Sequence, residues 1–398
     1  MTILSLNCGS SSLKFALFAR EGEREGGLGA ARLAEGAVER IGEATGRAWL
    51  RHGAARVEQE VACRDHAAAL HLAFGLLSSA GLPEVTIAGH RVVHGGPTHV
   101  APALVDGALL ASLRALTPLS PLHMPAALAG IDAVSALHPR LPQVACFDTA
   151  FHQGLPEVAR RLPLPDRFNQ DEVRRYGFHG LSYEYVLSTL RPVPARLVIA
   201  HLGNGASLVA VRDGRSVDTT MGLTPTGGVP MGTRTGDLDP GVLLYLARRY
   251  RLDLDALERL VDREAGLLAI GGTADMKTLL LRAPDDPRAR LAVDLFGYAI
   301  RKAIGAYAAA LGGLELLVFT GGIGERAPAI RAEACRGLEF LGVALEPGRN
   351  QANEPVISAR GSRAEVRVVA TDEDLVIARH ARRLLLERPG IPGPPALH

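Results

Sequence analysis

Residues 3–15 read Ile-Leu-Ser-Leu-Asn-Cys-Gly-Ser-Ser-Ser-Leu-Lys-Phe, and this stretch decides the fold prediction. The apolar residues 3–6 lead into a polar turn, and large apolar side chains then alternate with Lys14 and Ala16 up to residue 18. This pattern is typical of a strand, a tight turn and a second strand. A similar unit recurs at residues 197–211, with a Gly/Asn/Ser turn at its centre. Two such hairpins about half a chain apart predict an internal duplication.

Helical and strand patterns alternate after each hairpin, which predicts a mixed or parallel α/β sheet in each half of the chain. The expected helices cover 66–80, 125–137, 240–250 and about 290–311, and the expected strands cover 85–93, 143–147, 216–219, 314–319 and 366–370. Thr371 is the expected N-cap of a last helix that ends near residue 386. Ligands of such sheets bind beyond the carboxyl ends of the strands, where Asn7, Asp148, Gly203 and Gly322 are expected.

Composition places the chain among ordinary globular proteins with about two domains. The 398 residues are 47% hydrophobic and 22% charged, and the formal net charge is +2. A near-neutral chain offers no general field for nucleic acid or an anionic membrane, so we expect neither partner. Four cysteines without a CxxC pair, and no apolar run of membrane-spanning length, favour a cytoplasmic protein. The Pro-rich residues 192–194 are the expected linker.

Three glycine-rich stretches at predicted strand ends, 7–12, 203–207 and 321–324, indicate phosphate binding. Glycine lets the backbone approach a ligand closely, and successive N–H groups form an anion-binding nest. No Gly-Lys pair occurs in the sequence, so the Walker A pattern of P-loop kinases is absent. Residues 322–327 also fit the looser dinucleotide pattern GxGxx(G/A), which predicts nicotinamide binding. That alternative is disfavoured, because the motif lies late in the chain rather than in a first βαβ unit.

Two arginines lie among glycines and small residues, a setting that suits an anionic ligand. Arg234, in the segment 232–241, is expected either to bind a carboxylate or phosphate or to pair with Asp237 in a surface loop. Arg91 lies between His90 and His94 on a predicted strand that ends in two glycines. The two histidines could hold a metal, but their spacing suits a helix face rather than a strand. Structural roles are therefore the preferred interpretation.

Eight motifs follow one another from residue 3 to about residue 380, and on them the chain resembles the acetate kinases. That family belongs to the superfamily of acetate and sugar kinases, Hsp70 and actin. The matching motifs are residues 7–15, 90–96, 147–152, 176–180, 201–207, 231–240, 319–325 and 371–374.

The resemblance implies an α/β fold of two duplicated ribonuclease-H-like lobes, the actin-like ATPase fold, with an interlobe active-site cleft, in a homodimer. Residues 1–148 and 374–398 form the implied N-terminal lobe, and residues 149–373 form the nucleotide-binding lobe. The implied reaction is reversible, in-line phosphoryl transfer from ATP to acetate, giving acetyl phosphate and ADP. It requires Mg²⁺, for which Mn²⁺ is expected to substitute. Alternatives are a propionate or other short-chain carboxylate kinase and an actin- or Hsp70-like conformational ATPase.

The resemblance also assigns a role to individual residues. The implied catalytic residues are Asp148, Arg91, His179 and Arg234, and the implied metal-side residues are Asn7 and Glu373. The implied substrate-binding residues are Arg91, Val93, Leu122, Phe178 and Pro225. The implied nucleotide contacts are Ser10, Ser12, Lys14, His201, Leu202, Gly203, Asn204, Gly205, Asp275, Met276, Lys277, Gly322, Ile323, Gly324, Glu325 and Arg326. Val93 favours the smaller acid, because alanine there would enlarge the pocket.

Several positions depart from the usual pattern of the family. Lys277 stands where many relatives have an arginine against the nucleoside, and lysine cannot stack and fork as arginine does. We therefore expect a weaker or broader nucleotide preference. Arg326 and Met124 each stand where asparagine is usual. The usual Gly-Phe-His-Gly-Thr-Ser-His motif ends here in Leu-Ser-Tyr, so that Tyr183 replaces its last histidine.

Overall fold

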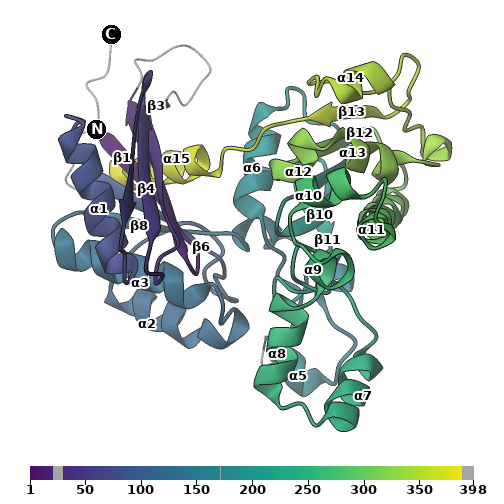
Figure 1. The fold of residues 1–398 in the computed structure, drawn as a ribbon, viewed down its shortest axis with the longest axis horizontal. Coiled ribbons are helices and arrows are strands. Elements are labelled where there is room, and N and C mark those ends of the chain that lie inside the picture. Colours follow the sequence, from purple (N-terminus) through teal and green to yellow (C-terminus); the bar gives the residue numbers. More distant parts are fainter. Residues whose placement is uncertain (21–29, 171, 388–398) are drawn as a thin grey trace. The chain divides into compact units, whose positions relative to one another are not determined.

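The computed structural model describes residues 1–20, 30–170 and 172–387 and divides the chain into two compact units (Figure 1). The first unit comprises Met1–Ala150 and Asp372–His398, and the second comprises Phe151–Thr371. Residues 192–194 lie inside the second unit, so the expected interdomain linker there is wrong. The predicted lobe boundaries at 148/149 and 373/374 lie within two residues of the boundaries of these units and remain a prediction. Residues 388–398 of the expected N-terminal lobe lie outside the described residues.

The first unit is built around one sheet that has helices packed on it. Its described strands are β1 (Thr2–Cys8), β2 (Ser12–Arg20), β3 (Ala30–Glu39), β4 (Gly46–His52), β5 (Ala55–Val61), β6 (Ile87–Val92), β7 (Ala103–Leu104) and β8 (Gln143–Phe147). Its described helices are α1 (His66–Ser79), α2 (Gly107–Ala115), the 3₁₀ turn η1 (Thr117–Leu119), α3 (Met124–Leu137) and α15 (Glu373–Leu386). The last helix thus returns from the far end of the chain to pack on β1, β6 and β8.

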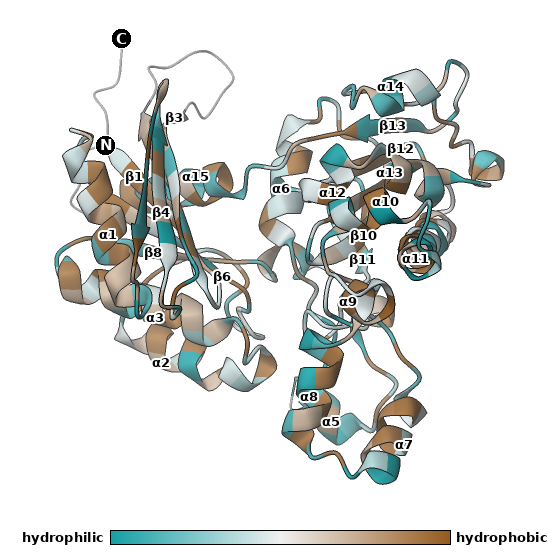
Figure 2. Cartoon of the chain, viewed as in Figure 1, coloured by the Kyte–Doolittle hydropathy of each residue, from teal (hydrophilic) through white to brown (hydrophobic). Residues whose placement is uncertain are grey.

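The strand order in this sheet is β5-β4-β3-β2-β1-β6-β8-β7. Strands β1–β5 pair antiparallel in succession, whereas β6 pairs parallel to both β1 and β8. Leu4 and Leu6 of β1 pack with α1 and α3 in the main core, and hydrophobic residues are prominent on these helices (Figure 2). Ser5 points to the opposite face, where its hydroxyl donates to Asp374 of α15 at 2.7 Å. Strand β1 is therefore buried on both faces, as its apolar run predicts.

The second unit contains a smaller sheet and most of the helices. Its described strands are β9 (Arg196–Leu202), β10 (Ala206–Arg212), β11 (Arg215–Thr219), β12 (Leu316–Thr320) and β13 (Glu365–Val368). Its described helices are α4 (Glu157–Arg160), α5 (Asp166–Gln170), α6 (Gly180–Thr189), α7 (Pro240–Tyr250), α8 (Leu254–Arg263), α9 (Gly266–Gly271), α10 (Met276–Arg282), α11 (Pro287–Leu311), α12 (Gly321–Arg326), α13 (Pro328–Cys335), the 3₁₀ turn η3 (Glu339–Leu341) and α14 (Pro347–Gln351). The 3₁₀ turn η2 (Ala150–His152) spans the boundary between the units.

The two sheets share one topology. The second has the order β11-β10-β9-β12-β13, with antiparallel β9–β10–β11 and parallel β9–β12–β13 pairing. The strands β3-β2-β1-β6-β8 of the first unit repeat that order and those directions. Helix α6 packs on alternate residues of β9, β10 and β12, and α11 also contacts β9 and β10. The predicted internal duplication is therefore confirmed at the level of strand order.

Three local expectations need correction. Residues 321–324 form the first turn of α12 rather than an open glycine-rich turn. Gly321 adopts φ +76, where a Cβ would lie 2.8 Å from the Leu202 carbonyl oxygen, and the residues after it are helical. The N-cap of α15 is Asp372 rather than Thr371, and its carboxylate accepts the Leu375 N–H at 3.0 Å. Strands β3–β5 were not expected. Within the described parts of the chain, no helix is both long and apolar enough to cross a bilayer.

Candidate active site

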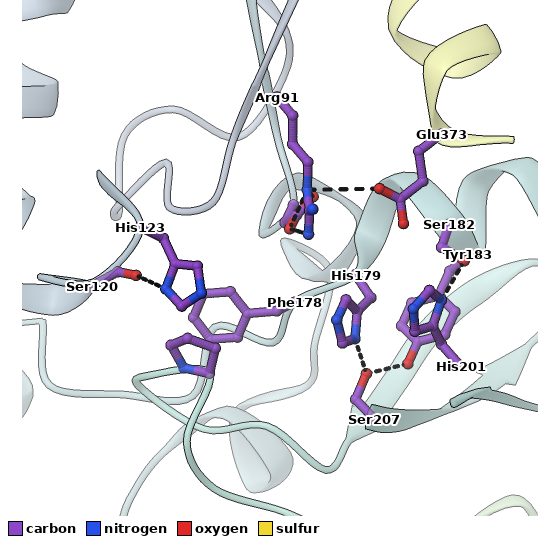
Figure 3. A network of polar contacts seen from close by, with 12 residues as sticks. Arg91, Ser120, His123, Phe178, His179, Ser182, Tyr183, His201, Ser207 and Glu373 are labelled. Carbon is purple, nitrogen blue, oxygen red and sulfur yellow. Dashed lines mark hydrogen bonds and ion pairs between the residues drawn. The ribbon is translucent and has the colours of Figure 1, made fainter. Parts of the chain in front are cut away.

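The first unit brings one arginine and two carboxylates together at the carboxyl ends of its parallel strands (Figure 3). Arg91 lies near the end of β6, Asp148 follows β8, and Glu373 begins α15. Nε of Arg91 donates to both Asp148 oxygens at 3.1 Å, and Nη2 donates to Oδ2 at 2.6 Å. Oε2 of Glu373 lies 3.7 Å from Nε of Arg91. These contacts fix the plane of the guanidinium by charge-assisted hydrogen bonds.

Burial and charge act in opposite directions on Arg91. Burial alone lowers its pKa, but the charges of Asp148 and Glu373 and the hydrogen bonds to Asp148 raise the pKa above its usual value. The Asp148 side chain is 1% exposed and that of Arg91 is 20% exposed. Arg91 therefore stays charged and keeps part of its surface open to an anionic ligand.

The hairpin turn of the first unit carries four other predicted residues. Asn7 lies in β1, opposite Lys14 of β2. Ser10 belongs to the turn that joins these strands, and Ser12 begins β2. The Gly9 N–H closes the turn by donating to the Ser12 carbonyl at 2.7 Å. Lys14 and Ser10 are exposed, while Asn7 and Ser12 are half-buried.

Two predicted apolar contacts, Val93 and Leu122, belong to the first unit. Val93 directly follows β6 and is buried. Leu122 is half-buried in the turn before α3, where Ser120 Oγ lies 3.4 Å from Nδ1 of His123.

The oxygen donors of the first unit suit Mg²⁺ better than a transition metal. The described residues contain no cluster of three or more His, Cys, Asp and Glu side chains that could hold a metal ion. Mg²⁺ does not need such a cluster, because it usually takes one or two carboxylates and completes its shell with waters and substrate phosphates. The Asn7 amide and the Glu373 carboxylate are donors of this kind, so the residues fit the implied ion.

His90 and His94 have structural partners, as preferred from the sequence. Nε2 of His90 lies 2.7 Å from Oε1 of Gln143, and Nδ1 of His94 accepts the Gly96 N–H at 2.9 Å. Burial lowers the pKa of His90 to about 4, so this histidine is neutral near neutral pH. His90 therefore ties β6 to the first residue of β8, and His94 binds the glycine-containing loop after β6. The metal alternative finds no support in these contacts.

The second unit presents His179 through a strained backbone. His179 is the N-cap of α6, and its φ of +58 lies in the left-handed region that non-glycine residues seldom adopt. Nε2 of His152 lies 3.0 Å from the carbonyl of Phe178, and Nδ1 of His152 lies 2.9 Å from Oγ of Ser216. Burial lowers the pKa of His152 to about 4. The neutral His152 therefore ties the Phe178–His179 backbone to β11.

Two stacked histidines lie between α6 and the β9–β10 hairpin (Figure 3). The rings of His179 and His201 are 4.2 Å apart and nearly parallel. Nδ1 of His179 lies 2.8 Å from Oγ of Ser207, and Nδ1 of His201 lies 2.8 Å from Oγ of Ser182. Charging both rings is unfavourable, because two positive charges at this separation repel by about 4 kcal/mol at an effective dielectric constant of 20.

Arg234 approaches His179 across Gly205. A Cβ on Gly205 would lie 3.2 Å from Nε2 of His179 and 3.6 Å from Nη1 of Arg234. Nη1 of Arg234 also donates to the carbonyl of Pro225 at 3.2 Å, whereas Oδ1 of Asp237 accepts the Gly228 N–H at 2.7 Å. Arg234 is thus oriented toward the His179 side of its loop.

A pocket of about 740 Å³ in the second unit gathers half of the predicted nucleotide contacts. Gly203, Asn204, Asp275, Met276, Lys277, Gly322, Ile323 and Arg326 line it, with Ala274, Leu280, Leu281 and Ala327. Asp275 caps α10 by accepting the Thr278 hydroxyl at 2.6 Å and the Thr278 N–H at 2.9 Å, and these bonds lower its pKa. Met276 is buried while Lys277 is exposed. The pocket is therefore lined by apolar side chains of α10 and by glycines that follow β9 and β12.

The other predicted nucleotide residues do not line that pocket. Leu202 is fully buried in β9, and Gly324 is buried in α12. Glu325 accepts the Thr371 N–H at 3.2 Å. The sequence assigned no role to Ser207 and Tyr183 next to His179, although Tyr183 was noted as a departure from the family motif, and it did not single out Leu280 and Leu281 at the pocket. Leu280 follows Met276 by four positions, and this helical spacing was a usable signal, whereas no local pattern indicated that the serine and the tyrosine contact His179.

Comparisons with known proteins agree on one family. The model of the acetokinase family matches residues 2–379. An acetate kinase of Streptomyces coelicolor is 44% identical over 406 residues, covering 97% of each chain, and one of Sulfurovum sp. is 40% identical over 395 residues, covering 95% of this chain and 98% of that one. The Porphyromonas gingivalis acetate kinase structure matches with a TM-score of 0.86 at 36% identity, covering 96% of this chain and 99% of that one.

A propionate kinase structure from Francisella tularensis matches with a TM-score of 0.90 at 34% identity and the same coverage. The chain therefore belongs to the acetokinase family. The predicted enzyme class, a kinase of the acetate kinase type, and the two-lobe actin-like ATPase fold are confirmed. The nicotinamide alternative is wrong, because residues 322–327 belong to a chain of the acetokinase family, and residues 322–326 lie in α12.

Proposed function

We propose that this protein catalyses the reversible, Mg²⁺-dependent transfer of a phosphoryl group from ATP to acetate, giving acetyl phosphate and ADP by direct in-line transfer. The observation that carries the proposal is the arginine that Asp148 and Glu373 hold charged at the strand ends. In the second unit, a nucleotide-sized pocket supports it. The proposal assigns Arg91, Arg234 and His179 to one reaction.

Positioning and charge stabilisation suffice for this chemistry. The transferred phosphoryl group spreads negative charge over its equatorial oxygens, and arginine and histidine N–H groups stabilise that charge. The acetate carboxylate is already ionised at pH 7, since its reference pKa resembles that of Asp or Glu. Asp148 is thus not needed as a base. Its role is to orient Arg91, which its hydrogen bonds already do.

Asn7 and Glu373 would hold Mg²⁺, together with the phosphates of the nucleotide; when bound, the ion neutralises phosphate charge. Lys14, Ser10 and Ser12 lie on the neighbouring turn and strand and are assigned to phosphate contacts. Mn²⁺ has the same preference for oxygen ligands and is expected to substitute.

The acyl pocket is assigned to Val93, Leu122, Phe178 and Pro225. Acetate is proposed as the preferred acid because Val93 is buried and takes up room that a longer chain would need. Propionate is the second candidate, which the similarity to a propionate kinase structure favours. An apolar pocket separates acids that differ by one methylene by only about 1–3 kcal/mol, so both acids are expected to react.

We also propose a homodimer formed through α7 and α8. Neither helix has a buried side chain, and they expose Val242, Leu244, Tyr245, Tyr250 and Leu254. Exposed apolar residues gathered in this way mark interaction surfaces. Analytical ultracentrifugation of the wild type and of a Leu244→Glu, Tyr245→Glu variant tests this. A dimer that becomes monomeric in the variant is expected, and a monomeric wild type would contradict the proposal.

A cytoplasmic location is proposed because the four cysteines are buried and form no disulfide, as in proteins of reducing compartments. No nucleic-acid or membrane partner is proposed.

ADP release from Mg-ATP with acetate, propionate and butyrate, measured side by side, tests the proposed function. We expect the highest kcat/KM with acetate, a lower value with propionate and the lowest with butyrate. Acid-independent ATP hydrolysis at an equal rate with each acid would instead point to the conformational ATPase.

A further inference from the structure

We infer that Ser207 and Tyr183 form a hydroxyl relay that fixes His179 in the tautomer carrying its hydrogen on Nε2. The relay would make His179 a neutral hydrogen-bond donor toward the transferred phosphoryl group. This inference rests on the proposed function and deepens it, because it assigns two positioning residues to the reaction. Neither of them was assigned a role from the sequence.

The relay consists of two consecutive contacts. Nδ1 of His179 lies 2.8 Å from Oγ of Ser207, and the hydroxyl of Tyr183 hydrogen-bonds the same Oγ (Figure 3). Ser207 lies on β10 and Tyr183 on α6, in the turn of helix that follows His179. Both side chains are fully buried. Two secondary-structure elements therefore hold the relay, and solvent does not compete for its hydrogen bonds.

The chemistry of the two hydroxyls sets the direction of the relay. A serine hydroxyl has one hydrogen, so it cannot donate to both Tyr183 and His179. A phenol is more acidic than an aliphatic alcohol and is the better donor of the pair. Tyr183 therefore donates to Oγ of Ser207, and Ser207 donates to Nδ1 of His179. An imidazole whose Nδ1 accepts a hydrogen bond carries its hydrogen on Nε2.

The Nε2 atom of His179 lies on the side where an anionic ligand is expected. A Cβ on Gly205 would stand 3.2 Å from this atom and 3.6 Å from Nη1 of Arg234. Glycine at this position leaves the backbone open between an imidazole and a guanidinium. A donor on Nε2 beside Arg234 complements phosphoryl oxygens, whereas a lone pair there would repel them.

The neighbouring histidine shows the same arrangement without the phenol. Nδ1 of His201 lies 2.8 Å from Oγ of Ser182, and its ring stacks on His179 at 4.2 Å. A neutral His179 avoids placing two charged rings in this stack. The relay therefore keeps His179 in the donor state without requiring that it be protonated to a cation.

Steady-state kinetics test the positioning role with matched pairs of variants. Ser207→Ala and Tyr183→Phe are expected to lower kcat about 10- to 100-fold, the range seen when a partner that orients a functional histidine is removed. The KM values for acetate and ATP should change less than about threefold, as for an interaction made mainly in the transition state. Ser207→Thr keeps the hydroxyl and should restore most of kcat. Tyr185→Phe and Thr189→Val, on the same helix, are the controls and should leave kcat unchanged.

Nitrogen NMR of histidine-labelled protein supplies the readout that a merely structural role would not move. The His179 signals, assigned by their loss in His179→Gln, should show hydrogen on Nε2 in the wild type. Ser207→Ala should shift the tautomer balance toward hydrogen on Nδ1. A wild-type ring with hydrogen on Nδ1, or a tautomer and kcat unchanged in Ser207→Ala, would overturn the relay. Wild-type protein without acid-dependent turnover would overturn the proposed function, while the NMR result would still decide the tautomer.

Discussion

Replacing Asp148 by asparagine tests the central cluster of the first unit, because it removes a charge and leaves the side-chain shape almost unchanged. Asp148 accepts three hydrogen bonds from Arg91, at 3.1, 3.1 and 2.6 Å, and its side chain is 1% exposed. In the variant, the nearest carboxylate to the Arg91 guanidinium that the structure shows is Glu373, 3.7 Å from Nε. Breaking one side of a buried pair costs about 3–5 kcal/mol, and Glu373 places this case at the lower end.

We therefore expect Asp148→Asn to lower the free energy of unfolding by about 3 kcal/mol, which is roughly 6–12 °C in Tm for a domain of this size. Turnover should fall as well, because Arg91 loses its orientation. Urea denaturation and acyl phosphate formation measure the two effects. The control is Asp132→Asn, which opens an exposed pair with Arg114 at 2.7 Å and should change stability by less than about 1 kcal/mol. Asp148→Asn with wild-type stability and near-wild-type turnover would refute the reasoning.

Three other predictions follow from single contacts. Burial lowers the pKa of His90 from 6.5 to about 4, so the contribution of neutral His90 to stability is complete above pH 6.5 and falls as the pH drops toward 4. In pH-dependent urea titrations, His90→Gln should remove up to about 3 kcal/mol of this loss of stability in acid. An unchanged pH profile in the variant would contradict the prediction. Gly205→Ala should lower kcat by at least tenfold with little loss of stability, because the alanine Cβ would lie 3.2 Å from Nε2 of His179. A kcat equal to that of the wild type would show that the substrate does not occupy the space beside Gly205. Lys277→Arg should raise the ratio of ATP to GTP turnover, and a wild-type enzyme already strongly selective for ATP would count against the expected broad preference.

The central strands could be predicted from the sequence because their signals are local. The apolar run in β1 is buried on both faces, and the Gly/Ser turn after it closes a hairpin whose register the alternation fixes. Strand β5 lacks such a signal, since nearly all of its side chains are exposed and only backbone pairing with β4 makes it a strand. Helix α12 was missed because its sequence carries a misleading signal rather than none. Its glycines predict a turn, and tertiary packing against β9 overrides their low helix propensity.

The candidate site could be predicted in part. Arg91 and Asp148 stand at the ends of apolar strands, where an α/β sheet places its ligands, and the sequence alone singled out both positions. The partners of His179 could not be found in this way. Ser207 follows it by 28 positions, and the contact depends on how α6 packs on β10. Side-chain pairs of this kind are set by packing rather than by any local pattern.

The most direct test of the account is acyl phosphate formation from Mg-ATP and acetate by the wild type and by Arg91→Ala and Arg234→Ala, with Arg290→Ala as an exposed control. The account predicts acetate-dependent acyl phosphate from the wild type and the control, and at least a hundredfold loss of turnover in both other variants with their folds intact. Undiminished acyl phosphate formation by either Arg91→Ala or Arg234→Ala, or none from the wild type while it still binds ATP, would contradict it.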